Sequence, residues 1–217
     1  TDFVGMGPFP LRMVRTYNSN RAPEMTFSFG AGWTHSYAAR LIGVGPEPFA
    51  RAIAYRPDGR ILTFQKVGPV WRGDPDVSQR LNLETDATGM PQWTLTENDD
   101  TVERYDGMGL LQSLTNRDGF SQTLIYVDPN GRNSSRVQKV VDSQGRVLTF
   151  GYNSTLQLTS VTDEAGRVFA YGYTGINLTS VTYPVPTGTR TRSYLYNEAG
   201  RTSGASLPGA LTGIVDE

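Results

Sequence analysis

A pattern that recurs every 20 to 26 residues constrains the fold of this chain more than any other feature of its sequence. Two apolar residues at three-residue spacing, followed by a polar turn that closes on glycine, occur in LQSLTNRDG (111–119), VQKVVDSQG (137–145) and LTSVTDEAG (158–166), and LTSVT returns at 178–182. Such self-similarity is typical of stacked supersecondary units, because one unit cannot bury its apolar face alone. The repeat therefore predicts an array of similar units.

A second segment follows each turn glycine and indicates that the unit is a β-hairpin. Its copies are FSQTLIY (120–126), RVLTFGY (146–152), RVFAYGY (167–173) and, after a longer connection, RSYLY (192–196). In RVFAYGY the aromatic residues alternate with small or aliphatic ones, which places the rings on one face of a strand. The aromatic residues that we expect to pack between neighbouring hairpins are Tyr105, Tyr126, Phe150, Tyr152, Phe169, Tyr171, Tyr173 and Tyr196.

Aspartate, asparagine and glycine mark the expected turns. Aspartate can bond to its own backbone two residues on, and glycine can take a positive φ angle. Asp58-Gly59 and Asn130-Gly131 are two-residue hairpin signals. The full set of predicted turn residues is Asp58, Gly59, Gly119, Asn130, Gly131, Asp142, Gly145, Asp163 and Gly166. The predicted fold class is all-β, with antiparallel β-hairpin repeats that form a curved or rolled sheet.

The chain is predicted to divide into three regions. Residues 1–50 lack the repeat, and the alternation in LRMVRTYNS (11–19) and GWTHSYAARL (32–41) predicts two strands joined by a loop that contains proline and glycine. The hairpin repeats are expected over residues 51–200. Residues 201–217 lose the aromatic pattern, which indicates a tail or the start of another region.

Composition and charge exclude several classes of site and partner. Cysteine is absent, which excludes disulfides and thiolate metal sites. With 20 Lys and Arg against 21 Asp and Glu, neither a nucleic-acid partner nor a polybasic membrane patch is implied. No apolar run approaches the roughly 18 residues of a membrane-spanning helix. The N-terminus TDFVGMGPFP lacks the features of a signal peptide, so we expect any export signal to lie outside this stretch.

Two groups of residues carry candidate chemistry, and each also has a purely structural interpretation. His35 is the only histidine, so a Ser-His-Asp triad or a histidine-bearing metal site would require it. Its position between Trp33 and Tyr37 on one strand face favours packing instead. Asp99 and Asp100 in TENDDTVERYD could bind calcium through oxygen ligands, but their spacing fits an acidic hairpin tip better. We therefore predict no catalytic residue, metal or cofactor, and we expect the chain not to be an enzyme.

The repeats resemble those of the RHS or YD-repeat proteins of bacteria, which run Tyr-Asp-x-x-Gly-Arg-Leu and close on an aromatic residue. Residues 105–111 (YDGMGLL) match this pattern with Leu110 at the usual arginine position, and residues 196–201 (YNEAGR) match it with Asn197 in place of aspartate. The opening segments FPLRMVRTYNSN and FGAGWTHSY also look like the module that precedes the repeats in many such proteins.

The resemblance implies a hollow, strand-rich shell that encloses or presents a toxin domain of a polymorphic toxin. The expected partners are the rest of the same shell, an enclosed C-terminal toxin domain and components of a secretion system, and the expected location is secreted or at the cell surface. A sheet residue covers roughly 16 Å², so this chain tiles about 3,500 Å², whereas a shell around a guest of about 100 residues needs roughly 6,000 Å². We therefore expect a fragment of a longer shell or a short relative with another role.

The segment Asp128-Pro129-Asn130-Gly131 relates to self-cleavage in RHS toxins, where a pair of Asp-Pro-x-Gly motifs resembles an aspartyl cleavage site. Two carboxylates are needed to share a proton and activate water. The next turn, 142–145, lacks the proline, so the second copy is missing and a simple turn is predicted.

Two functions follow from the sequence. The preferred one is a non-catalytic structural segment of an RHS-repeat shell. The alternative is a carbohydrate-binding or adhesive cell-surface β-repeat module, which requires the aromatic stripes to face solvent. In either case unpaired strand edges are expected to favour self-association.

Overall fold

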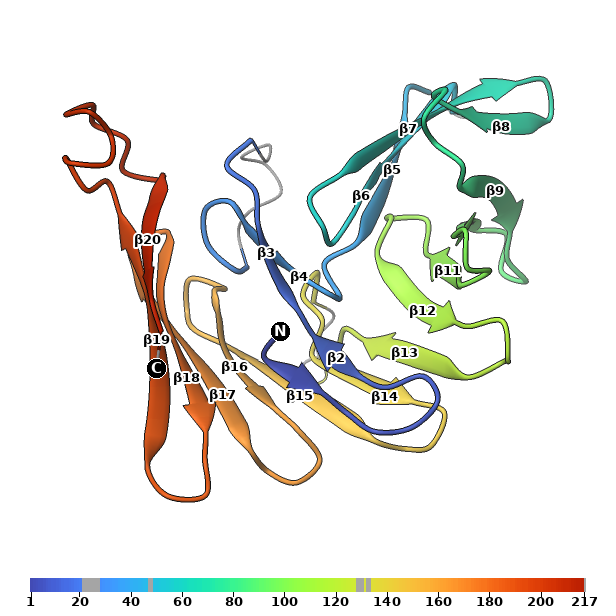
Figure 1. Ribbon diagram of the computed structural model, residues 1–217. Coiled ribbons are helices and arrows are strands. Elements are labelled where there is room, and N and C mark those ends of the chain that lie inside the picture. Colours follow the sequence, from blue (N-terminus) through green and yellow to red (C-terminus); the bar gives the residue numbers. More distant parts are fainter. Residues whose placement is uncertain (21–27, 47–48, 128–130, 132–133, 217) are drawn as a thin grey trace.

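The computed structural model describes residues 1–20, 28–46, 49–127, 131 and 134–216. Within them the protein is all-β and antiparallel, which confirms the predicted fold class (Figure 1). The twenty described strands are β1 (Phe3–Val4), β2 (Arg12–Met13), β3 (Arg15–Tyr17), β4 (Trp33–His35), β5 (Arg40–Val44), β6 (Arg51–Tyr55), β7 (Ile61–Val67), β8 (Val70–Gly73), β9 (Arg80–Thr85), β10 (Pro91–Thr96), β11 (Val102–Tyr105), β12 (Leu111–Thr115), β13 (Ser121–Ile125), β14 (Lys139–Asp142), β15 (Val147–Tyr152), β16 (Leu158–Thr162), β17 (Val168–Thr174), β18 (Asn177–Pro184), β19 (Thr189–Tyr196) and β20 (Leu211–Val215).

The largest sheet contains twelve strands, β9 to β20, and each strand pairs with the next one in the chain. The four predicted repeats form the hairpins β12–β13, β14–β15, β16–β17 and β18–β19. The sheet is curved and open: β19 and β20 stand at one side of Figure 1, and β9 to β12 stand at the other. Strand β20, which the sequence pattern does not predict, pairs with β19 and extends the sheet by one strand.

One type of turn recurs between these strands. The backbone N–H of its first residue donates to the carbonyl of the fifth residue, and the N–H of the fourth residue donates back to the first. The three residues between the first and the fifth form a loop whose last member has a positive φ angle, a position that suits glycine. In six turns the side-chain oxygen of the first residue also accepts the N–H groups of the third and fifth residues; these first residues are Asp86, Asp106, Asn116, Asp142, Asn153 and Asp163.

The turn at Asp58 and Gly59 is longer than the two-residue loop that the dipeptide predicts. Arg56 donates its N–H to the carbonyl of Arg60, so the loop consists of Pro57, Asp58 and Gly59. In a two-residue loop made of Asp58 and Gly59, Pro57 would face Arg60 and would have to donate a backbone N–H to it, which proline lacks. The loop therefore takes the three-residue form of the other turns, with Gly59 at φ 86°.

The tyrosines that close the repeats bind within their own hairpins. Their hydroxyls donate to carbonyls at the start of the first strand of the same hairpin over 2.7 to 2.8 Å, in the pairs Tyr126–Leu111, Tyr152–Val137, Tyr173–Leu158 and Tyr196–Leu178. At Tyr152, Tyr173 and Tyr196 the register with the following strand shifts, as in a β-bulge. The first three repeats thus carry a turn bond at one end and a tyrosine bond at the other, and the fourth shares the tyrosine bond.

The N-terminal strands are shorter than the alternation predicts. Residues 11–19 contain β2 and β3, and residues 32–41 contain β4 and the start of β5, with residues 36–39 outside any strand. The predicted strand over 32–41 is interrupted because β4 pairs with β3 in one sheet, whereas β5 pairs with β6 in another. The alternation itself reports burial correctly, since Trp33, His35, Tyr37, Ala39 and Leu41 are all buried.

Strands β5 to β8 form a separate sheet that lies beside β9 to β12 (Figure 1). The β5–β6 hairpin spans the region boundary that the sequence predicts at residue 50. The rings of Phe49 and Trp71 contact Trp93 on β10, with centroid separations of 5.8 and 5.0 Å. A shared apolar core therefore joins this sheet to the twelve-stranded one.

Candidate functional site

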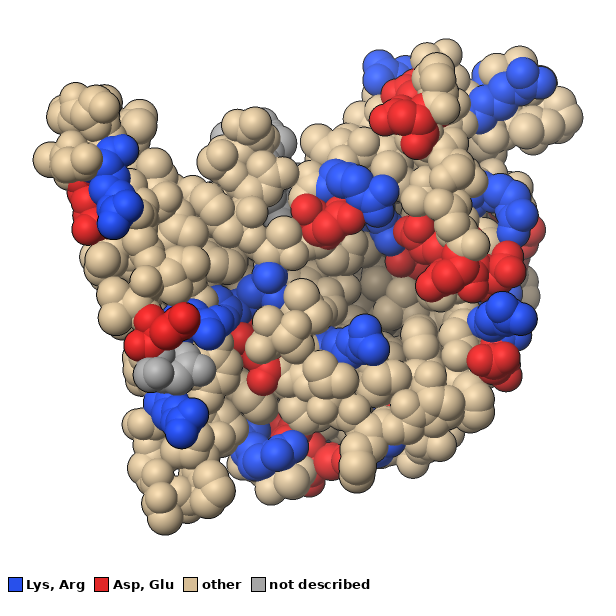
Figure 2. Space-filling view, in the orientation of Figure 1, with Lys and Arg blue, Asp and Glu red and all other residues tan. Residues whose placement is uncertain are grey.

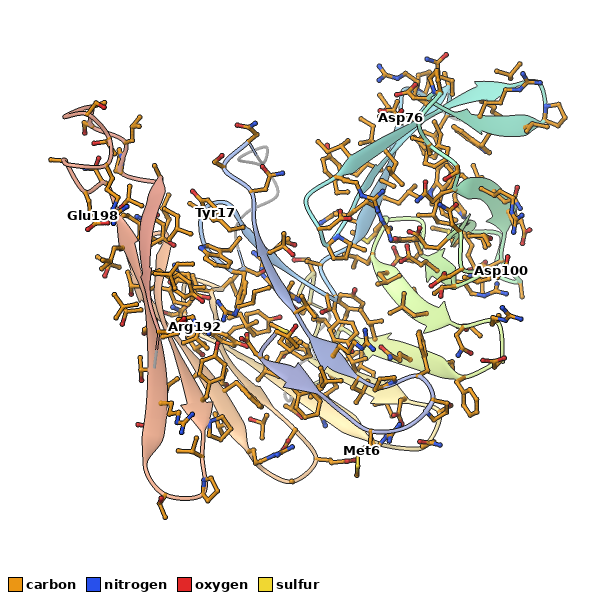
Figure 3. The ribbon with its side chains drawn as sticks, viewed as in Figure 1. Met6, Tyr17, Asp76, Asp100, Arg192 and Glu198 are labelled. Atoms are coloured by element: carbon orange, nitrogen blue, oxygen red, sulfur yellow. The ribbon has the colours of Figure 1, made fainter. Side chains whose placement is uncertain are left out.

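The face of β13 to β19 that carries the repeat rings is covered by residues 1–20 and 28–39, which are called the N-terminal segment below. Figure 1 shows its strands within the curve of the sheet, and Figure 3 shows side chains filling the space between them. Ring contacts join the two layers in the pairs Phe3–Phe169, Phe29–Tyr171, Tyr37–Phe150 and Trp33–Tyr194. This covered ring face is the most elaborate interaction surface among the described residues.

The predicted ring residues therefore lie in a closed layer. Phe150, Phe169 and Tyr171 are 3%, 6% and 4% exposed. Tyr126, Tyr152, Tyr173 and Tyr196 are partly buried and pack against the same core. Tyr105 is fully buried but belongs to a polar cluster between the two larger sheets, which is described below.

A buried ion pair lies at the centre of the ring face. The guanidinium of Arg15, on β3, donates to both carboxylate oxygens of Asp2 at 2.5 and 2.7 Å and to the hydroxyls of Tyr183 and Tyr194. Asp2 also accepts bonds from Tyr171 and Tyr183 at 3.1 Å each. The Arg15 and Asp2 side chains are only 4% and 0% exposed. Burial by itself would lower the pKa of Arg15, but its bonds to Asp2 outweigh burial and raise that pKa.

Hydrogen bonds also tie the N-terminal segment to two strands that lie far apart in the sheet, β13 and β19. On β13, the side chain of Gln122 donates to the carbonyls of residues 9 and 10 and accepts a hydrogen bond from the hydroxyl of Tyr37. On β19, the hydroxyl of Tyr196 accepts a hydrogen bond from the indole N–H of Trp33 at 2.8 Å. The segment is thereby tied to the sheet from β13 to β19.

Tyr17, labelled in Figure 3, extends these ties to the last strand. Its hydroxyl accepts the backbone N–H of Leu211, the first residue of β20, and donates to the carbonyl of Gly209. The N-terminal segment therefore contacts strands whose residues lie almost 200 positions away in the sequence.

A second buried arginine joins the two larger sheets. Arg56, next to β6, donates to both carboxylate oxygens of Glu103 on β11 at 2.6 and 2.7 Å and to Glu97 at 2.6 Å. It also donates to the hydroxyl of Tyr105, which in turn donates to Glu103. Burial would lower the pKa of Arg56, and the bonds to Glu103 raise it instead. Gln79 completes the cluster with a bond to Glu97 at 3.0 Å.

Tyr183 and Tyr196, two tyrosines near Arg15, are held in their protonated form. Burial raises the pKa of Tyr183 to about 12, and the negative charge of Asp2 adds to this effect. Burial likewise raises the pKa of Tyr196 to about 12. A hydroxyl with a raised pKa donates hydrogen bonds well and is a poor nucleophile or base near neutral pH. These groups are thus suited to binding and positioning.

His35 lies inside the covered layer and is 2% exposed. Its ring contacts Phe29 and Phe150 at centroid separations of 5.5 and 5.9 Å, and its Nδ1 accepts the backbone N–H of Tyr37 at 3.3 Å. These contacts give it the packing position that its place between two aromatic residues predicts.

The acidic residues near residue 100 are distributed over separate interactions. Asp99 accepts the N–H of Thr101 in the β10–β11 turn, and that bond lowers its pKa. Asp100 lies 3.5 Å from Arg80. Since Glu97 and Glu103 both bind Arg56, no group of three or more potential metal ligands occurs in the described part of the chain.

The remaining glycines predicted for turns have positive φ angles in the described structure. Gly119, Gly145 and Gly166 have φ angles of 85°, 82° and 76° in hairpin turns, and Gly131 has a φ of 76°. Asp128, Pro129 and Asn130 lie outside the described residues, so the single Asp-Pro-x-Gly motif stays a prediction.

Charge is mixed over the visible face of the molecule. In Figure 2 the Lys and Arg side chains lie close to Asp and Glu side chains, with uncharged surface between the groups. Across the described ranges, there is no helix with the length and apolar character needed to cross a membrane.

The buried arginines are the residues that the sequence interpretation missed. Arg15 carries a usable signal, because it alternates with Leu11 and Met13 on an apolar strand face. A cation on such a face needs a buried acid, which the sequence alone does not identify. Arg56 lies in a turn segment, where no periodic pattern reports burial.

Comparison with known proteins finds a similarity to a family model in the N-terminal part of the chain. Residues 1–64 match a family described as "Domain of unknown function (DUF6531)". The match covers the N-terminal segment, the strands β5 and β6, and the first four residues of β7. No curated protein matches the chain.

Proposed function

We propose that this chain is a non-catalytic segment of an RHS-type repeat shell that encloses or presents a toxin domain. The observation that carries the proposal is the sheet topology: twelve strands follow one another in chain order, and each new hairpin adds to the edge left by the previous one. A sheet built in this way can grow by further repeats without rearrangement. Among the described residues, the outer edge of β20 has no partner strand and is available for such growth.

The polar clusters support a structural role. In each cluster the arginine binds across two layers: Arg15 of the N-terminal segment binds Tyr194 on β19, and Arg56 beside β6 binds Glu103 on β11. Charges that neutralise one another in this way hold strands in position. The same bonds raise the pKa values of Arg15 and Arg56, so both side chains stay charged.

The covered ring face refines the proposal. Because the N-terminal segment occupies the inner face over β13 to β19, we infer that this part of the shell is a filled end wall. The guest would then contact other parts of the shell. The sheet area that one chain supplies, about 3,500 Å², agrees with a partial wall when roughly 6,000 Å² is needed.

No observation favours the carbohydrate-binding alternative, which requires aromatic stripes that face solvent. Phe150, Phe169 and Tyr171 face the N-terminal segment instead. Burial removes the flat ring surface on which a sugar would stack.

The proposal is tested on the natural polypeptide that contains this sequence. Its intact mass in extracts and in secreted fractions of the source cells should be several times 23.8 kDa. Limited proteolysis of that polypeptide should leave a C-terminal guest uncut until denaturant opens the shell. A mass near 23.8 kDa, or a guest that is cut as fast in the intact protein as in denaturant, would contradict the proposal.

A further inference from the structure

A pocket of about 110 Å³ lies at the seam between the N-terminal segment and the sheet, where the chain enters β5. A pocket of this size has room for several waters or for one small ion of four or five heavy atoms. Its polar lining comes from both layers and consists of Ser28, His35, Tyr37, Arg40, Tyr126, Ser135, Arg136 and Tyr152.

Two arginines in this lining lack the partners that the other buried arginines have. Arg40 and Arg136 form no ion pair with any described residue, whereas Arg15 and Arg56 each bind carboxylates. The Nε atom of Arg40 is buried without a hydrogen-bond partner. Arg136 uses its Nε for the carbonyl of Leu156 at 3.3 Å, which leaves its two terminal nitrogens unassigned within the described chain.

The pocket therefore brings two positively charged side chains together. Its described lining contains no aspartate or glutamate. Burial lowers the pKa of Arg136, and the positive charge of Arg40 lowers it further, which reports that the two cations interact. Two guanidinium groups that share a small pocket repel each other, and an anion between them would remove this repulsion.

The geometry points to a binding site for one small oxyanion, phosphate or carboxylate, held between Arg40 and Arg136. Guanidinium groups bind such anions through paired N–H donors. The hydroxyls of Ser28 and Ser135 add further donors. The hydroxyls of Tyr126 and Tyr152 already donate to carbonyls, so they keep the walls of the pocket in place.

Occupancy of this site would tie the two layers together. Arg40 begins β5, directly after the N-terminal segment, and Arg136 belongs to the connection between β13 and β14. An anion bound by both is a bridge between segments that are almost 100 residues apart in the sequence. Because only the folded chain brings the arginines together, binding should stabilise the folded state.

The test is thermal unfolding and calorimetric titration of the whole chain with inorganic phosphate and, separately, with acetate, against chloride at matched pH and ionic strength. Phosphate is expected to raise the unfolding midpoint and to bind with one site per chain. A rise with phosphate alone would identify a tetrahedral oxyanion as the ligand, and a rise with both salts would include carboxylates from either small molecules or polypeptides.

Variants connect this response to the pocket. Arg136→Gln should weaken phosphate binding by about 10- to 100-fold, the loss expected for a hydrogen bond to a charged group. In chloride the same variant should unfold at or above the parental midpoint, because one of two repelling cations is gone. Arg40→Gln should also lose the phosphate response, and Arg72→Gln, on the exposed part of β8, should keep it. Absence of any anion-specific rise, or a parental rise in Arg136→Gln, would overturn the proposal.

Discussion

The repeat hairpins and the N-terminal segment contain similar residues, yet different contacts hold them in place. In the β14–β15 hairpin, Asp142 binds the turn and Tyr152 binds Val137, so every specifying bond lies within about one repeat. In the N-terminal segment, Arg15 reaches Tyr183 and Tyr194, which lie 168 and 179 residues away. The sheet's register is thus specified locally, while the cover over its ring face is specified by contacts distant in sequence.

This difference leads us to expect that neither region is stable alone. A single layer of hairpins with a row of exposed rings lacks a core, because a sheet must bury its apolar face against another layer. The N-terminal segment has strands of only two or three residues before β5 and also depends on that contact. We therefore expect the N-terminal segment and β13 to β20 to fold as one cooperative unit.

The largest effect is expected from alkaline pH, which acts on the tyrosines at the boundary between the two regions. The folded-state pKa of Tyr183 and Tyr196 is raised to about 12, above the unfolded value of about 10. Their contribution to stability is therefore fully present below pH 10 and is lost as the pH rises from 10 through 12. Tyrosinate absorbance and circular dichroism should change together in this range. Ionisation of all tyrosines near pH 10 with the fold retained would contradict the expectation.

The next largest effect is expected from Arg15→Met. The substitution leaves the Asp2 carboxylate buried without its cation, and breaking a buried pair in this way costs about 3–5 kcal/mol. Urea unfolding should show the loss in a single transition. Adding Asp2→Asn to this variant should restore part of the stability.

Arg60→Met is the matched control for this comparison. Arg60 also pairs with an aspartate, but its side chain is 59% exposed. Its loss should change the unfolding free energy by about 0.5 kcal/mol or less. Equal effects of the two substitutions would show that the Arg15 cluster does not hold the N-terminal segment on the sheet.

A smaller effect is expected from removing one tyrosine bond inside a repeat. Tyr152→Phe leaves the Val137 carbonyl without its hydroxyl donor and should cost about 1–3 kcal/mol. Tyr55→Phe is the control, since the Tyr55 hydroxyl has no hydrogen bond among the described residues. Chemical denaturation should separate the two variants, and a loss as large for Tyr55→Phe would refute a specific role of the repeat tyrosine.

The smallest effect is expected in the turns. Asp163→Ala removes an acceptor for two backbone N–H groups and a partner of Arg167, at a cost of about 1–2 kcal/mol. Asp163→Asn keeps the acceptor oxygen and should cost clearly less, because Asn116 and Asn153 serve the same purpose in other turns. Unfolding curves that place the two variants at the same stability would contradict this role of the side-chain oxygen.

The same distinction between local and distant contacts sets what the sequence could predict. Alternating rings and turn residues such as Asp163 and Gly166 report structure within a few residues, so the hairpins and the common face of their rings follow from the pattern, while the burial of that face depends on the N-terminal segment. The pairing of Arg15 with Asp2 needs hydroxyls from three later strands, and no local pattern encodes it. Strand β20 was missed because it lacks the aromatic alternation and gains its position by pairing with β19.

The RHS-type shell proposed for this chain requires that the end wall be stable as built. Repeats specified locally can be added one after another, and the covered ring face would prevent the first ones from exposing a large apolar surface. In this proposal, the N-terminal segment covers the ring face of the sheet at one place, and the edge of β20 accepts further repeats at another.

Residue-resolved hydrogen exchange under native conditions tests the central claim most directly, because it measures the opening of each region separately. If the N-terminal segment and the repeats share one core, the slowest amides of β3 and β4 and those of β14 to β18 should exchange with the same opening free energy. Destabilisation by Arg15→Met should lower both together. Fast exchange confined to the N-terminal segment, with β14 to β18 still fully protected, would contradict the claim.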